Sequence, residues 1–137
     1  MTQITPDKAQ KPDTRQDSFF KQRLNAFGYA FNGIIQLARY ETHIQIHLFN
    51  TVVAVGMFYL LGISATEWMF ICISITLVFI AEGLNTAIEK LADAVTEDFS
   101  EKIKIVKDIS AGASIIASFN AVIVGLIIVL NNLQTPF

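Results

Sequence analysis

The chain is poor in the residues that build disulfide frameworks, turns and charged surfaces. Its 137 residues include one cysteine, three prolines and seven glycines, and only 16% of them are charged. A single cysteine excludes an internal disulfide and a zinc site made of four cysteines. A hydrophobic content of 53% argues against a disordered chain. A formal net charge of −2, with basic residues in short separated groups, offers no footprint for a nucleic-acid backbone, so we expect no nucleic-acid partner.

Three long runs of the sequence carry no formal charge. They cover residues 44–63, 68–81 and 109–130. Twenty helical residues at ~1.5 Å each reach ~30 Å, the hydrocarbon thickness of a bilayer. The helical pattern of the second run continues beyond Glu82. We therefore predict an all-α membrane protein with transmembrane helices at about 44–63, 66–95 and 108–130. A soluble three-helix bundle would need charged helix faces, which these runs lack.

A different pattern precedes the first run. Between residues 18 and 42, apolar side chains recur at every third or fourth position with polar side chains between them. This spacing is typical of an amphipathic helix that lies in the membrane interface. Residues 1–17 are polar and contain no apolar segment of the kind found in a cleaved signal peptide, so we expect a disordered tail. Residues 18–137 are then expected to form a single integral membrane domain.

The basic residues predict how the helices are oriented in the membrane. Six of the ten lysine and arginine residues precede the first charge-free run, and four lie between the second and third runs. The link at residues 62–67 and the end of the chain after residue 130 contain none. Because basic residues accumulate on the cytoplasmic side of membrane proteins, we expect the N-terminus in the cytoplasm and the C-terminus outside.

Polar side chains are concentrated where the second predicted transmembrane helix leaves its charge-free run. Glu82, Asn85, Glu89 and Asp93 are spaced so that they share one helix face, as a stripe ~16 Å long. Glu82 directly follows fourteen uncharged residues, where a carboxylate needs a cation, a metal ion or a proton. Asp93 can equally be explained as a carboxylate solvated on the cytoplasmic side.

Further polar residues are predicted to meet this stripe at the cytoplasmic interface. Glu41 precedes the first transmembrane helix, and Lys107 and Asp108 precede the third. Carboxylates without nearby cysteine suit magnesium, which proteins hold by one or two carboxylates together with substrate phosphates. Lysine and asparagine can donate hydrogen bonds to phosphate oxygens. The arrangement indicates phosphoryl transfer at a membrane surface, although no P-loop, GxGxxG or protein kinase catalytic-loop motif occurs.

Two other interpretations of these polar residues stay open. His43 and His47 are four residues apart and could bind a metal ion with Glu41, although no HExxH motif accompanies them. Glu82 alone would also suit a small non-enzymatic membrane protein, either a proton-coupled carrier or an assembly subunit. A carrier would not explain why Asn85, Glu89, Lys107 and Asp108 all converge on the cytoplasmic side.

The third transmembrane helix contains small residues at regular spacing. Ser110, Ser114 and Ser118 repeat every four residues. Small side chains at this spacing allow close approach of helices in lipid. Because three helices enclose little space for a large ligand, we expect a homo-oligomer.

Two segments resemble the signature of a known family. Residues 82–89 (EGLNTAIE), followed by Asp93 and by residues 106–112 (VKDISAG), are similar to the motifs of prokaryotic diacylglycerol kinase and undecaprenol kinase. The resemblance extends from about Arg23 to Leu130 and includes Tyr29, Gly33 and Glu41. It implies a small homotrimer of the bacterial inner membrane that transfers the γ-phosphate of ATP directly to a lipid alcohol. The products would be phosphatidate from diacylglycerol or undecaprenyl phosphate from undecaprenol.

The resemblance also implies a role for each site residue. Glu82 would be the general base and would contact the lipid substrate together with Arg23, while Glu41 and Glu89 would bind magnesium. The residues implied to bind ATP are Tyr29, Glu41, Asn85, Glu89, Asp93, Asp98, Phe99, Ser100, Lys107 and Asp108. Residues 46–48 and Thr86 are more similar to the undecaprenol kinase branch, in which asparagine is common at the position of His43.

Overall fold

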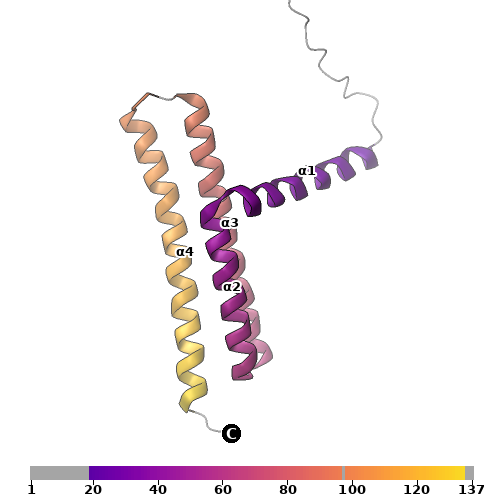
Figure 1. Cartoon of the computed structure of the whole chain (residues 1–137), viewed down its shortest axis with the longest axis vertical. Helices are drawn as coiled ribbons and strands as arrows, with labels where there is room; N and C mark the ends of the chain where they lie inside the picture. The colour runs from indigo at the N-terminus through magenta and orange to yellow at the C-terminus, as the bar shows by residue number, and fades with distance from the viewer. Residues whose placement is uncertain (1–18, 97, 135–137) are drawn as a thin grey trace, which may run out of the picture. The chain divides into compact units, whose positions relative to one another are not determined.

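The computed structural model describes residues 19–96 and 98–134, and their side chains from residue 21 to residue 133. Within these ranges the chain forms four α-helices and no strand, which confirms the predicted all-α class. The helices are α1 (Phe19–Tyr40), α2 (Thr42–Leu61), α3 (Ala65–Val95) and α4 (Glu101–Gln134) (Figure 1). The disordered tail predicted for residues 1–17 lies outside the described residues.

Three of these helices are long and apolar enough to cross a bilayer: α2, α3 and residues 101–133 of α4. Large apolar side chains are exposed along each of them, including Leu60 at 86%, Met69 at 60% and Ile116 at 72%. Surfaces of this kind are unfavourable in water and favourable against lipid or another apolar helix. The protein is therefore a multi-pass membrane protein with three candidate transmembrane helices, as predicted.

The contacts of the chain divide it into two compact units, one ending at Ile35 and the other beginning at Gln36. In the first unit, α1 carries exposed apolar side chains at Leu24, Phe27, Phe31 and Ile34. Their spacing of three or four residues gives this part of α1 one apolar face. The amphipathic helix predicted over residues 18–42 is thus present, and it ends at Tyr40.

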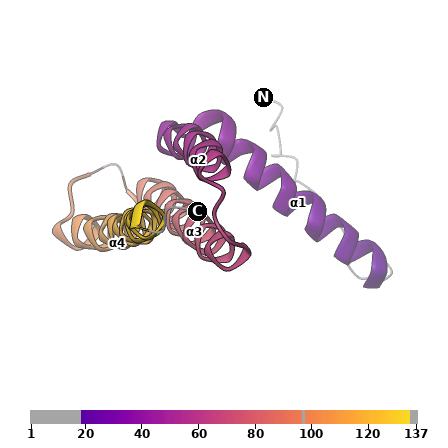
Figure 2. The same cartoon turned by 90° about the horizontal axis from the view of Figure 1, so that it is seen from below.

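The second unit is built from α2, α3 and α4. Helix α3 contacts α4 extensively and α2 to a smaller degree. Figure 2 shows the three helices nearly along their axes, with α3 between its two neighbours. Ser110 and Ser114 of α4 are buried, as expected for small residues at a close helix contact. Because α3 runs opposite to both neighbours, α2 and α4 run in the same direction (Figure 1).

The turn between α2 and α3 fixes one end of this unit. Gly62 adopts φ of 70°, a left-handed conformation that glycine tolerates without strain, and ends α2. Ser64 and Glu67 then form a reciprocal capping box at the start of α3. Asn132 Nδ2 donates a hydrogen bond of 3.1 Å to Glu67 Oε1, which ties the end of α4 to the start of α3.

An apolar cluster fills the same end of the unit. Phe58, Ile63, Ile71 and Ile128 are buried together, and Trp68 packs against them. The polar residues of the predicted site lie farther along α3. Glu82 is fifteen residues beyond Glu67 on the same helix, a rise of ~22 Å.

Candidate active site

The polar stripe of α3 changes from buried to exposed along the helix. Glu82 and Asn85 are only 9% and 8% exposed. Glu89 is half-buried, and Asp93 is exposed. This order is the one expected of a helix that leaves an apolar environment towards its C-terminus.

Glu82 faces a histidine of α2. Its Oε1 lies 3.3 Å from Nε2 of His47, and the two side chains are 11% and 24% exposed. Sequence reasoning considered His47 as a metal ligand together with His43, which the structure leaves exposed, and as part of the resemblance of residues 46–48 to the undecaprenol kinase branch. Among the described residues, no three histidine, cysteine, aspartate or glutamate side chains gather as a metal site. The sequence did indicate that His47 needs a polar partner, because it lies within a charge-free run. It could not indicate Glu82 as that partner, because the contact depends on how α2 packs on α3.

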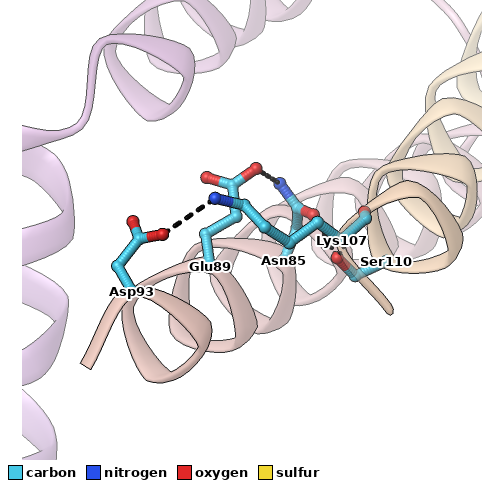
Figure 3. A network of polar contacts seen from close by, with 5 residues as sticks. All are labelled: Asn85, Glu89, Asp93, Lys107 and Ser110. Carbon is cyan, nitrogen blue, oxygen red and sulfur yellow. Dashed lines mark hydrogen bonds and ion pairs between the residues drawn. The ribbon is translucent and has the colours of Figure 1, made fainter. Parts of the chain in front are cut away.

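Asn85 joins α3 to α4 through a buried hydrogen-bond network (Figure 3). Its Oδ1 accepts a hydrogen bond of 2.7 Å from Ser110 Oγ. Its Nδ2 donates to Glu89 Oε1 at 3.1 Å. The Ser110 hydroxyl also lies 2.9 Å from the carbonyl oxygen of Lys107. Sequence reasoning treated Ser110 only as a small residue at a helix contact and missed this polar role.

Glu41 is held close to α3 by a lysine. It lies in extended conformation between α1 and α2, and its Oε1 is 2.8 Å from Nζ of Lys90. Glu89 and Asp93 also interact with the charge of Lys90. Lys90 is therefore paired with Glu41 and also lies within electrostatic range of two carboxylates of its own helix. Sequence reasoning did not include Lys90 among the site residues, although its position directly after Glu89 indicated that it could pair with a carboxylate of the site.

A polar cavity of about 430 Å³ lies between the end of α3 and the start of α4. Two ion pairs line it, Lys107 with Asp93 and Lys104 with Asp108, each with an N···O distance of 2.9 Å. The cavity brings together six residues that were predicted to bind ATP, and it adds Lys104, which was not predicted. The residues lining it are Asp93, Thr96, Asp98, Phe99, Ser100, Ile103, Lys104, Lys107 and Asp108.

A second cavity of about 530 Å³ runs along α2 and α4 and changes from polar to apolar. His47, Asn50 and Thr51 of α2 and Ser118 of α4 form its polar part. Because α2 and α4 run in the same direction, these residues lie towards the same end. The rest of the lining is apolar and consists of Ala54, Met57, Phe58, Ile75, Val78, Ala121, Val122, Gly125, Leu126 and Val129. Such a cavity suits an amphiphilic molecule with its polar group beside His47, which contacts Glu82.

Two predicted site residues belong to the unit that ends at Ile35. Arg23 and Tyr29 are both exposed on α1. The contacts of Arg23 with lipid and of Tyr29 with adenine stay predictions.

Similarity to known proteins covers most of the chain. A profile of the family described as prokaryotic diacylglycerol kinase matches residues 28–129. The chain is 36% identical over 115 residues to undecaprenol kinase of Bacillus subtilis (strain 168), covering 84% of this chain and 90% of that protein. It is also 36% identical over 103 residues to diacylglycerol kinase of Synechocystis sp., covering 74% of this chain and 59% of that protein.

The matched region contains the features from which the resemblance was inferred. Residues 28–129 include the whole polar stripe of α3, both cavities and every predicted site residue except Arg23. A carrier or an assembly subunit is not needed to explain Glu82, since the match to a family of lipid kinases covers the segment that contains it. The chain belongs to the prokaryotic diacylglycerol kinase family and is a lipid kinase.

Proposed function

We propose that the protein transfers the γ-phosphate of ATP, with magnesium, to the hydroxyl of diacylglycerol or undecaprenol. The observation that carries the proposal is the contact of Glu82 with His47 at the polar part of a largely apolar cavity. A lipid alcohol matches this cavity because its hydrocarbon chain contacts the apolar wall while its hydroxyl stays near the carboxylate.

In the proposed reaction Glu82 is the general base. Its carboxylate accepts the hydroxyl proton as the lipid oxygen forms a bond to the γ-phosphorus. The bond between the γ-phosphorus and the bridging oxygen breaks, and ADP leaves. Phosphate passes directly from ATP to lipid, and no phosphorylated enzyme is formed.

We assign the nucleotide to the polar cavity between α3 and α4. Lys107 and Lys104 are well suited to phosphate oxygens because each is held at the cavity by a single carboxylate. Binding of ATP would exchange these carboxylate contacts for phosphate contacts. Asp98, Phe99 and Ser100 would line the nucleotide site. Asn85 does not line this cavity, and its proposed contact with the phosphates rests on the sequence resemblance alone. For Tyr29 beside the adenine and Arg23 beside the lipid, the proposal rests on the sequence resemblance alone.

Magnesium would be held by Glu41 and Glu89. Both are carboxylates, both are half-buried, and both interact with Lys90. This donor set fits magnesium, which needs only one or two carboxylates when substrate phosphates complete its shell. The bound ion would neutralise negative charge on the transferred phosphate.

We further propose a homotrimer in the bacterial inner membrane, with the N-terminus in the cytoplasm. Lys104 and Lys107 of α4 support this orientation, since both line the polar cavity, where cytoplasmic ATP would enter. A groove of about 740 Å³ along α3 and α4 supports assembly. Apart from Asn85, Ser110 and Asn120 its lining is apolar, as expected for a surface that contacts another transmembrane helix.

Both lipid alcohols are expected to be phosphorylated, with a preference for undecaprenol. An apolar cavity wall makes similar contacts with any hydrocarbon chain, so it distinguishes the two lipids weakly. Even a tenfold preference for one of them needs ~1.4 kcal/mol of additional transition-state stabilisation. The preference is supported by the match over 90% of the Bacillus subtilis undecaprenol kinase. The measurement is kcat/KM for each lipid in the same mixed micelles at matched surface concentration. A clear preference for diacylglycerol would contradict the assigned branch, and phosphorylation of neither would contradict the proposed function.

A further inference from the structure

Glu82 contacts the imidazole of His47, with Oε1 at 3.3 Å from Nε2. Asn85, three residues along α3, uses its amide for hydrogen bonds with Ser110 and Glu89. Among the described residues, the polar side chain that contacts the Glu82 carboxylate is therefore that of His47. A carboxylate that is only 11% exposed is costly to keep ionised unless a donor or a cation faces it.

We propose that His47 is a positioning residue for the general base. With a proton on Nε2, the imidazole donates a hydrogen bond to Oε1 of Glu82, fixes the orientation of the carboxylate and leaves Oε2 to accept the lipid hydroxyl proton. His47 also lines the cavity assigned to the lipid, so it lies where base and acceptor meet. The inference rests on the proposed role of Glu82 as general base.

The surroundings of His47 contain few other groups that could titrate with it. On α2, His43 lies one turn earlier and is exposed. At the start of α2, Glu41 is paired with Lys90. From α3 the contacting group is Glu82. Helix α4 contributes a serine and apolar residues to the shared cavity and no titratable side chain.

The test compares three substitutions of His47 for phosphorylation of undecaprenol. We expect His47→Ala to lower kcat roughly tenfold or more without changing KM for ATP, because the base loses its orienting donor. The amide nitrogen of glutamine can occupy the place of Nε2, so His47→Gln should restore most of the lost activity. The shorter amide of His47→Asn matches Nδ1 instead and should not. His43→Ala, one turn away and exposed, is the matched control and should behave like the unmodified protein.

A double substitution shows whether the two residues act as one unit. Once Glu82→Gln has removed the base, adding His47→Ala should lower kcat no further, because the effects of two substitutions in one interacting pair do not add. If Glu82→Gln retains activity, the proposed general base is wrong. If Glu82→Gln is inactive but His47→Ala keeps a normal kcat, the role of His47 is overturned. Equal activity of His47→Gln and His47→Asn would overturn it as well, even if the alanine variant failed to fold.

Discussion

Replacing Glu82 with glutamine is expected to lower kcat for lipid phosphorylation by ~10² or more while ATP still binds. Glutamine keeps the size of the side chain and its ability to accept a hydrogen bond from His47, but it cannot take a proton from the lipid hydroxyl. The polar cavity assigned to ATP is lined by residues 93 to 108 and does not include Glu82. The measurement is kcat with undecaprenol as acceptor, together with the Kd for ATP in the absence of lipid.

Glu67→Gln is the matched control for this substitution. Glu67 lies at the opposite end of α3, where it completes a capping box and accepts a hydrogen bond from Asn132. Glutamine also serves at this capping position, so the helix should stay intact and turnover should be normal. Near-normal turnover in Glu82→Gln would remove Glu82 from the role of base.

Neutralising either proposed magnesium ligand is expected to raise the magnesium concentration needed for half-maximal rate and the KM for ATP, each by roughly tenfold. Glu41 and Glu89 come from different parts of the chain, and the ion would bridge them to the phosphates. Loss of either carboxylate is therefore expected to weaken the binding of magnesium and of ATP together. The variants Glu41→Gln and Glu89→Gln would be compared in magnesium titrations at fixed ATP and in ATP titrations at saturating magnesium.

The ion pair between Glu41 and Lys90 requires a separate control, because Glu41→Gln also breaks that contact. Lys90→Gln removes the same ion pair but keeps both carboxylates. If Glu41 binds magnesium, Lys90→Gln should not raise the magnesium requirement, since it removes a cation that competes with the ion. An increase as large as that of Glu41→Gln would mean that the ion pair, and not metal binding, explains the effect.

The helices could be predicted because their signals are local. A charge-free run of bilayer length predicted α2 closely, and a shorter run followed by a continuing helical pattern predicted α3 closely. Helix α4 differs more, because it begins at Glu101 and continues to Gln134, whereas the predicted transmembrane helix covered about 108–130. Apolarity reports the segment that lies in hydrocarbon, whereas backbone hydrogen bonding continues through the polar turns at each end.

The site could be predicted only in part. The spacing of Glu82, Asn85 and Glu89 placed them on one helix face, and the family resemblance supplied their expected roles. The partners of these residues could not be predicted, because they depend on which faces of α2 and α4 turn towards α3. The contact of His47 with Glu82 and the hydrogen bond from Ser110 to Asn85 are of this kind. No periodicity within one helix specifies a contact between two helices.

Direct transfer of phosphate from ATP to a membrane lipid alcohol is tested by following the γ-phosphate itself. Purified protein in mixed micelles would receive γ-labelled ATP, magnesium and undecaprenol, and label would be measured in lipid, protein and free phosphate. The structure and the family predict one labelled lipid phosphate for each ADP formed, with no label on the protein and none formed by Glu82→Gln above ~1% of the normal rate. Label that appears as free phosphate, or that accumulates on the protein while the lipid stays unlabelled, would contradict this mechanism.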